Sequence, residues 1–130
     1  MEKVLKFLKD AKVYYLATIN EGKPDIRPFG TINMYNNRLY IQTGRVKNCY
    51  KQMKENENVS ICAFLNGEWL RIDAKAVEDP TLEAEKSMLD SYPELQNMYK
   101  AGDGNTVVFY LKDVTATFSS FTKAPEVHKF

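Results

Sequence analysis

Seven consecutive residues in the first half of the chain carry the groups that phosphate binding needs. The sequence QTGRVKN at positions 42–48 runs from the end of an expected strand to the start of an expected helix. Unpaired amides at the start of a helix attract anions, and the glycine lets the chain curve around one. Arg45 and Lys47 add positive charge, while Thr43 and Asn48 can donate hydrogen bonds to phosphate oxygens. The stretch predicts a phosphate cradle, and a solvated turn of the same composition is the alternative.

A tryptophan and an arginine lie close together on a strand face that the core does not use. Asn66-Gly67 predicts a tight hairpin turn and so fixes how side chains alternate along the strand that follows. Alternate apolar residues of this strand point into the core: Leu70, Ile72, Ala74 and Ala76. The opposite face carries Trp69, Arg71, Asp73 and Lys75. An indole beside a guanidinium outside the core is typical of a binding surface, and cover by the N-terminal helix or by a second subunit explains it equally well.

The expected strand from Ile26 to Tyr35 has more polar groups on one face than packing requires. That face carries a cation, a ring, a hydroxyl and an amide, on Arg27, Phe29, Thr31 and Asn33. Pro28 has no amide hydrogen and therefore favours an edge strand or a bulge. Gly30 would let another backbone or a flat ring approach closely. These features predict either a ligand surface or an edge strand protected by charge and proline.

The side chains that usually perform hydrolysis are missing or misplaced. No G-x-S-x-G motif occurs, and no pair of acidic residues falls on an expected pocket face. Cys49 and Cys62 are too few for a zinc site, and the one histidine, His128, lies close to the end of the chain. No catalytic residue can be named, and any enzymatic activity is expected to rest on a bound cofactor.

Short turns join most of the expected elements. Helices are predicted from Lys3 to Ala11, over about ten residues after Gly44, and from an Asp79-Pro80 start to a stop before Pro93. Strands are predicted at Val13–Ile19, Ile26–Tyr35, Arg38–Thr43, Val59–Leu65, Glu68–Val77, Thr106–Leu111 and Val114–Phe121. The first three strands are expected to form a meander, the fourth to be buried on both faces, and the last two to turn at Lys112-Asp113. Mainly antiparallel strands with short helices favour an α+β class with a closed or nearly closed barrel, in a single domain of residues 1–130.

The overall charge argues against strongly charged partners. Basic and acidic residues nearly cancel, 18 against 17, which disfavours nucleic acid or an anionic membrane surface. No apolar run approaches the roughly 20 residues of a bilayer span, and charged residues interrupt the N-terminal segment as they do not in a signal peptide. We therefore expect a cytoplasmic protein with no membrane and no nucleic-acid partner.

Five pieces of the sequence occur in an order and spacing that carry a resemblance. They are YLAT at 15–18, RPFGT at 27–31, LYIQTG at 39–44 followed by Lys47-Asn48, WLR at 69–71 and TFSSF at 117–121. Together they resemble the pyridoxamine 5′-phosphate oxidase-like, FMN-binding split-barrel family over nearly the whole chain. The resemblance implies an antiparallel split β-barrel that works as a homodimer, with flavin mononucleotide (FMN) held at the subunit interface and touched by both chains.

The same resemblance implies which residues bind the cofactor. In chain order they are Arg27, Pro28, Phe29, Gln42, Thr43, Lys47, Asn48, Trp69, Arg71 and Phe118. The first three would lie along the isoalloxazine and ribityl chain, the next two at the ring system and sugar, and Lys47 with Asn48 at the phosphate. Trp69 and Arg71 would approach from the partner subunit, and Phe118 belongs to the last strand.

The end of the chain departs from the family pattern. True pyridoxamine 5′-phosphate oxidases have a basic, tryptophan-containing C-terminal stretch that helps to bind the substrate phosphate, whereas this sequence ends in TKAPEVHKF at 122–130. Pyridoxamine phosphate is therefore not the expected substrate. Relatives that bind haem or deazaflavin leave these groups as alternatives to FMN.

The leading functional hypothesis is an FMN-dependent oxidoreductase, linked to NAD(P)H, that acts on a small planar molecule such as a quinone or a nitro compound. A non-enzymatic FMN-binding electron carrier or flavin-storage protein is the alternative, because no substrate-binding extension is recognisable. A third possibility is a dimeric β-barrel binding module without flavin, and this class includes nucleic-acid binders. A basic, aromatic patch could be formed by Arg45, Lys47, Tyr50, Lys51 and Lys54, but the nearly neutral net charge argues against it.

Overall fold

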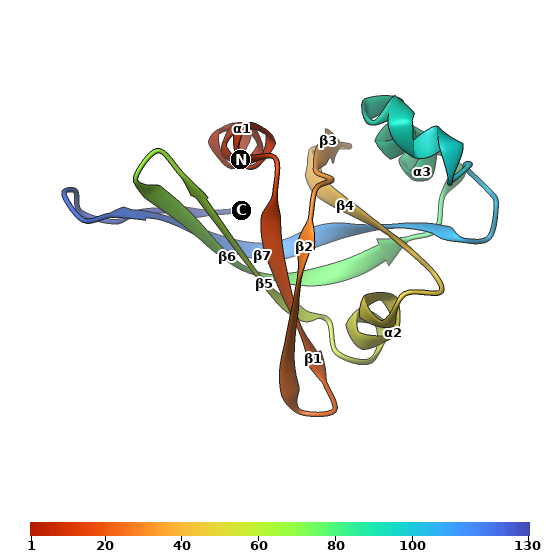
Figure 1. Ribbon diagram of the computed structural model, residues 1–130, viewed down its shortest axis with the longest axis horizontal. Helices are drawn as coiled ribbons and strands as arrows, with labels where there is room; N and C mark the ends of the chain where they lie inside the picture. Colours follow the sequence, from red (N-terminus) through yellow and green to blue (C-terminus); the bar gives the residue numbers. More distant parts are fainter.

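One strongly twisted antiparallel sheet with short helices beside it makes up the chain (Figure 1). The computed structural model describes all 130 residues. Its strands are β1 (Tyr14–Asn20), β2 (Lys23–Phe29), β3 (Asn33–Tyr35), β4 (Arg38–Gly44), β5 (Asn58–Leu65), β6 (Glu68–Asp79), β7 (Thr106–Ser120) and β8 (Glu126–Lys129). Its helices are α1 (Glu2–Ala11), α2 (Asn48–Glu55), α3 (Leu82–Ser91) and the 3₁₀-helix η1 (Pro93–Asn97).

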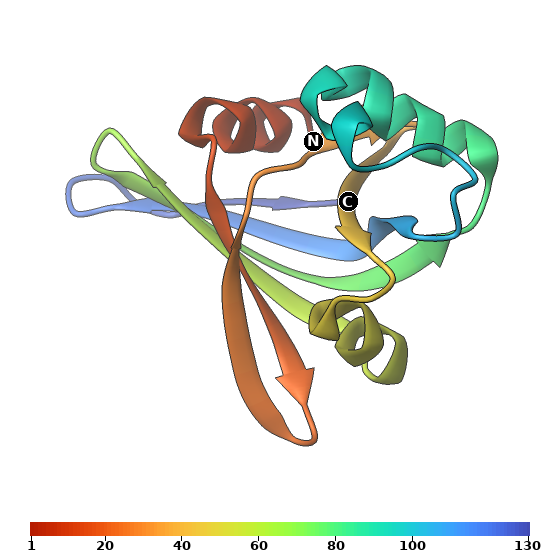
Figure 2. The same ribbon diagram turned by 45° about the vertical axis from the view of Figure 1, so that its right-hand side comes forward.

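The strand order makes the sheet a split barrel. Along the sheet the strands run β2-β1-β5-β6-β7-β4-β3, and β8 adds to β7. The sheet is not closed, because its end strands β2 and β3 are joined only by residues 30–32 and do not pair with each other. The β1–β2 hairpin projects away from the body, while α1 and α3 lie beside the opposite end of the sheet (Figure 2). The predicted mainly antiparallel split barrel is therefore confirmed.

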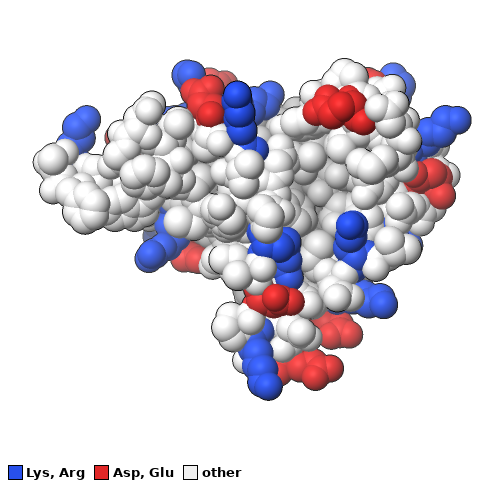
Figure 3. Space-filling model, viewed as in Figure 1, with Lys and Arg blue, Asp and Glu red and all other residues white.

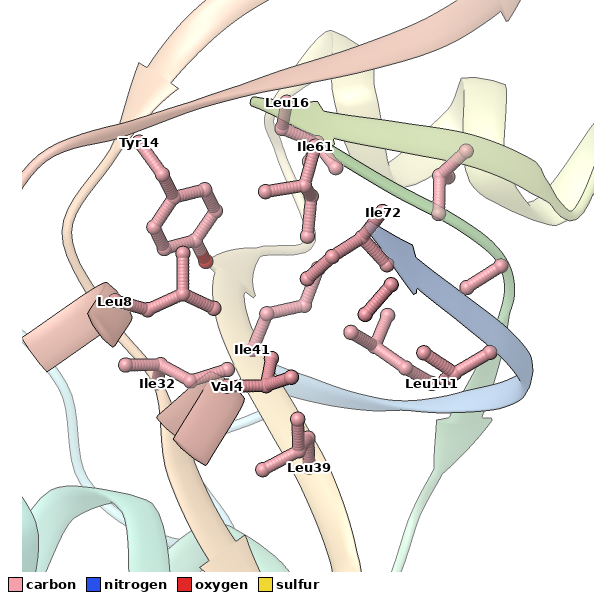
Figure 4. Packing of buried hydrophobic residues seen from close by; sticks show 14 of the residues in the cluster. Val4, Leu8, Tyr14, Leu16, Ile32, Leu39, Ile41, Ile61, Ile72 and Leu111 are labelled. Atoms are coloured by element: carbon pink, nitrogen blue, oxygen red, sulfur yellow. The ribbon is translucent and has the colours of Figure 1, made fainter. Parts of the chain in front are cut away.

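The core fills the concave side of this curved sheet. Alternate strand residues meet the apolar face of α1 there, as Val4, Leu8, Leu16, Ile41, Ile61 and Ile72 illustrate (Figure 4). The side chains of β6 alternate as predicted, since Leu70, Ile72, Ala74 and Ala76 are all buried. Burying such side chains stabilises the fold by about 1.5–3 kcal/mol each, which fixes the register of the strands that carry them.

Two hairpin turns have the backbone that their residues favour. Asn66 and Gly67 have φ of 52° and 78°, and Asn36 and Asn37 have φ of 51° and 60°. Positive φ at both central residues gives a turn whose twist matches that of the flanking strands. Both predicted turns are therefore confirmed.

Two of the predicted strands are divided differently in the structure. The expected Ile26–Tyr35 strand is two strands, β2 and β3, at opposite ends of the sheet. Both pairings of the predicted meander occur, since β1 pairs with β2 and β3 pairs with β4, but the middle strand is broken and β2 does not lie beside β4. Conversely, the two expected strands at 106–121 are one strand, β7. Asp113 adopts a φ of 53° beside a register shift opposite Asp73 and Lys75, so it forms an irregularity within the strand and not a turn between two.

Two further predictions are corrected by burial and capping. β5 is not buried on both faces, because Cys62 and Phe64 are exposed on its outer side.

The third helix, α3, begins at Leu82, after Thr81, whose hydroxyl accepts a hydrogen bond from the Ala84 amide at 3.3 Å. Asp79 is not the cap itself. Although burial raises the pKa of its carboxyl, hydrogen bonds from Tyr40 and Thr81 outweigh burial and leave that pKa below its usual value.

None of the helices combines the length and the apolar character that a membrane crossing requires.

Candidate functional site

A pocket of about 280 Å³ lies where β2, β4 and α2 come together. Its lining comprises Arg27, Pro28, Phe29, Gly30, Thr31, Gln42, Thr43, Lys47, Cys49 and Tyr99. In the space-filling view the centre of this face is hollowed, with Lys and Arg side chains beside the hollow (Figure 3). Six of the ten residues predicted to bind a cofactor, from Arg27 to Lys47 in chain order, thus meet in one pocket.

The side chains of Tyr14 and Tyr92 and the main chain of β4 hold the segment 30–32, which forms one wall of this pocket. The Tyr14 hydroxyl donates to the Thr31 carbonyl oxygen at 2.6 Å, and the Tyr92 hydroxyl bonds both the amide and the carbonyl of Ile32 at 2.9 Å. The main-chain amide of Gln42 donates a hydrogen bond to Thr31 Oγ1 at 3.1 Å. Burial raises the pKa of Tyr14, so its hydroxyl remains a donor at all physiological pH values. The wall is therefore rigid, and the Gly30 and Thr31 amides make no hydrogen bond within the chain.

Arg27 ties the pocket wall to helix α2. Its Nη1 donates to the Leu16 carbonyl oxygen at 3.1 Å and to Thr18 Oγ1 at 2.8 Å, and its Nη2 donates to Gln52 Oε1 at 2.9 Å. Gln52 Nε2 in turn donates to Asp25 Oδ2, which also lies 3.3 Å from Arg27 Nη2. The guanidinium is thus engaged by β1, β2 and α2, and Arg27 positions the pocket more than it offers a free charge.

Replacing Arg27 by methionine should lower the free energy of unfolding by about 1–3 kcal/mol, because Thr18, Gln52 and Asp25 lose a shared, largely buried partner. Urea denaturation measures the change. Lys23→Met, on the same strand but exposed and free of ion pairs, is the matched control and should change stability little. Equal stability of the two variants would show that the network contributes nothing.

One unpaired cation stands at the start of α2. Arg45 is engaged: its Nε donates to the Gly104 carbonyl oxygen at 3.0 Å, its Nη1 to the Tyr50 hydroxyl at 2.7 Å, and its Nη2 lies 3.5 Å from Glu78. Lys47 is exposed and makes no ion pair or side-chain hydrogen bond. No side chain caps the first amides of α2, which Lys47 precedes. Lys47 and these amides together form a positive end of the pocket that suits an anion.

The other predicted residues lie elsewhere. Asn48 is the exposed first residue of α2, next to Lys47 but outside the pocket lining. Trp69 and Arg71 lie on the outer face of β6, where the Trp69 ring packs on Phe121 with centroids 5.2 Å apart. Phe118 is 2% exposed and belongs to the main core, against the ring of Phe7. Within one chain, the structure does not bring these four residues to the pocket.

Two pocket residues were not recognised in the sequence as belonging to the site. Cys49 is buried in α2 and its sulfur lies 3.3 Å from Thr43 Oγ1. Tyr99 follows η1 and reaches the pocket from a segment remote in sequence. Nothing local distinguishes Tyr99 from a surface tyrosine, since only the tertiary fold brings it beside β4.

The pocket contains donors and apolar surface but few groups for proton transfer. No carboxylate and no imidazole lines it. The chain also has no cluster of three or more His, Cys, Asp or Glu side chains that could hold a metal ion. Its donors and apolar surface, with a positive end at Lys47, suit the binding of an anionic ligand.

Comparisons with known proteins bear on the family and the fold. The sequence model of the family described as pyridoxamine 5′-phosphate oxidase matches residues 1–112. No protein with a curated description matches the sequence. A NimC/NimA family protein from Clostridium acetobutylicum is 35% identical, with a TM-score of 0.95 over 100% of this chain and 93% of its own.

Two more distant solved structures share the fold. A pyridoxamine 5′-phosphate oxidase-related, FMN-binding protein from Nostoc punctiforme is 14% identical, with a TM-score of 0.65 over 99% of this chain and 93% of its own. A protein from Bacteroides thetaiotaomicron, whose proposed role is 5-nitroimidazole antibiotic resistance, is 15% identical, with a TM-score of 0.66 over 90% of this chain and 82% of its own.

Proposed function

The chain belongs to the pyridoxamine 5′-phosphate oxidase family, and from that premise we propose that it is a homodimeric FMN-dependent oxidoreductase that acts on a small planar molecule other than pyridoxamine phosphate. The observation that carries the proposal is the pocket itself. It combines an unpaired lysine and a helix start at one end with a rigid wall of aromatic and unpaired amide groups beside it.

The donor set of this pocket fits FMN. Lys47, Thr43 and the first amides of α2 would hold the phosphate, with Asn48 at the rim. Phe29 would lie against the isoalloxazine, and the free main-chain amides of Gly30 and Thr31 would donate hydrogen bonds to its heteroatoms. The pocket's volume of about 280 Å³ lies at the small end of the roughly 300–1,000 Å³ typical of ligand sites, which supports a site completed by another surface.

A second copy of the chain is the natural source of that surface. The outer face of β1, β2 and β5 exposes Tyr15, Ile26 and Phe64 to 51%, 63% and 64%. A cavity of about 420 Å³ lies on this face beside Cys62 and Arg71, and an open groove of about 770 Å³ continues from it through Ala17, Ser60 and Asp73. Apolar side chains in such number are typical of an interface. We propose that two copies pair through this face and that Trp69 and Arg71 of each approach the flavin of the other.

When bound, FMN would supply two-electron chemistry between NAD(P)H and a planar acceptor. The residues of this chain would bind and orient it: Lys47 would neutralise the phosphate, the 30–32 wall would fix the ring, and the partner face would exclude water. The proposed role of the Bacteroides protein supports a nitro-substituted heteroaromatic ring as the acceptor class.

The absence of a carboxylate or an imidazole from the pocket favours a second candidate, an FMN-binding electron carrier or flavin store. Such a protein needs no proton donor of its own. Steady-state oxidation of NADH or NADPH separates the two candidates. Turnover with a nitroaromatic or quinone acceptor supports the enzyme, whereas tightly held flavin without turnover supports the carrier.

The direct test of flavin binding is the visible spectrum of the purified protein before and after addition of FMN. We expect a bound flavin spectrum, either as isolated or after reconstitution, with one FMN per chain. A colourless protein that does not perturb the spectrum of added FMN would exclude both candidates.

A further inference from the structure

Tyr99 brings a phenol to the positive end of the pocket from a distant part of the chain. It follows η1, and its amide donates to the Leu95 carbonyl oxygen at 2.8 Å. Its ring lies against Gly44, the last residue of β4, so closely that a Cβ at position 44 would stand 3.1 Å from the Tyr99 hydroxyl and 3.4 Å from its Cε1. Gly44 lies between Thr43 and the Arg45–Lys47 segment. The hydroxyl therefore lies at the end of the pocket that suits an anion.

The Tyr99 hydroxyl has no partner within the chain. Four other tyrosines, Tyr14, Tyr40, Tyr50 and Tyr92, each use their hydroxyl in a hydrogen bond that joins two elements. Tyr99 makes no such bond, although it is half-buried and lines the pocket. Its hydroxyl is therefore free to donate a hydrogen bond to an acceptor in the pocket.

The segment that carries Tyr99 is fixed against the phosphate end. The Asp103 carboxylate accepts hydrogen bonds from the amides of Lys100, Asn105 and Thr106 at 2.9, 2.7 and 2.7 Å. These bonds lower the pKa of Asp103, so its carboxylate stays charged and the turn stays closed at neutral pH. The Arg45 amide donates to the Asn105 carbonyl oxygen at 2.7 Å and ties the turn to the loop before α2. Tyr99 is thus held in place before any ligand arrives.

We propose that Tyr99 is a specificity-determining residue whose hydroxyl donates a hydrogen bond to the phosphate of the bound flavin. This inference rests on the proposed function, since it assigns a further residue to the same site. Position 44 is sensitive to this placement, because a Cβ there would also stand 3.3 Å from Asn105 Oδ1, and the Tyr99 hydroxyl would have to shift by a few tenths of an ångström to accept it. The proposed hydrogen bond makes the site selective for a phosphorylated flavin over riboflavin.

Fluorescence titration of the apoprotein with FMN and with riboflavin tests this role. Tyr99→Phe should weaken FMN about 5- to 20-fold and change riboflavin less than about twofold, because only FMN has the phosphate acceptor. Tyr110→Phe is the matched control, because the Tyr110 hydroxyl also lacks a hydrogen bond, while its ring packs under Arg38 and lies outside the pocket. That variant should bind both flavins as the wild type does.

A double-mutant cycle with Gly44 tests the contact independently. Gly44→Ala should weaken FMN in the presence of Tyr99 and weaken it much less in the Tyr99→Phe background, where the closest clash is gone. Equal losses of FMN and riboflavin in Tyr99→Phe, or no loss of either, would overturn the role of Tyr99 while leaving the flavin site intact. A wild-type protein that binds neither flavin would instead overturn the proposed function, and the role of Tyr99 with it.

Discussion

Replacing Tyr15 by aspartate is expected to convert the proposed dimer into monomers and to weaken FMN binding by at least about 100-fold. Tyr15 is 51% exposed on β1, opposite Cys62 of β5 and beside the cavity of the outer face. Arg71 lines the same cavity, but the proposed pairing directs it to the other copy's flavin, so a carboxylate buried at position 15 would cost several kcal/mol. Every 1.4 kcal/mol is about a factor of ten in affinity. Light scattering coupled to gel filtration measures the mass, and flavin fluorescence measures the affinity.

The matched controls separate the effect of the interface from that of the charge. Tyr15→Phe keeps the apolar face and should remain dimeric. Leu82→Asp places the same charge on a side chain of similar exposure, 55%, at the start of α3 and away from the outer face. It should stay dimeric and bind FMN normally. A Tyr15→Asp protein that remains dimeric, or that binds FMN unchanged as a monomer, would contradict the proposal that this face completes the site.

The same outer face marks the limit of what hydrophobic patterning can predict. The strand Val59–Leu65 was expected to be buried on both sides, yet Cys62 and Phe64 point out of the core. A hydrophobic pattern shows which side chains are apolar, but it does not show whether the same chain or a second subunit buries them. A face that a second subunit would cover therefore has the same pattern as a core face. The prediction that β5 is buried on both faces is wrong for a single chain. In the proposed dimer, the second copy would bury the outer face of β5.

The parts of the site that are continuous in sequence could be predicted, because local rules govern them. Residues 42–48 cross from a strand end to a helix start, and this order alone suggests an anion site. Pro28 favoured an edge strand or a bulge, and β2 lies at one end of the sheet order. The break between β2 and β3 was missed because the alternation of side chains continues through residues 30–32, and the tertiary bonds of Tyr14 and Tyr92 decide where the strand ends.

Contacts between distant segments could not be predicted. Tyr99 lies against Gly44 because η1 and the turn at Asp103 bring the chain back to the end of β4. The hydrophobic pattern of the sequence does not predict this path of the chain. The commitment of Arg27 to Thr18 and Gln52 is of the same kind: the sequence marked it as an exceptional cation, but only the packing of α2 against β1 shows its partners. Among the cations near the pocket, the structure therefore leaves Lys47 as the unpaired one.

Lys47→Ala should weaken FMN about 10- to 100-fold and leave riboflavin within about twofold, because a hydrogen bond between charged groups contributes about 1.5–3 kcal/mol and only FMN carries the phosphate. Isothermal titration of the apoprotein with each flavin measures both affinities. The loss should shrink as ionic strength rises, since Lys47 is exposed and its charge is screened.

Lys51→Ala is the control that gives this result its meaning, because Lys51 lies on α2 as well, is exposed and makes no ion pair. If general positive charge attracted the flavin, both variants would lose the same affinity for FMN. If Lys47 contacts the phosphate, only Lys47→Ala should lower the affinity for FMN.

The pH dependence of FMN affinity should also differ between the wild type and Lys47→Ala. Phosphate monoesters lose their second proton near pH 6, so FMN affinity should fall as the wild type is acidified through that range and fall less in Lys47→Ala. Equal losses for FMN and riboflavin would place the phosphate elsewhere, and Arg45 would have to leave Glu78 to bind it.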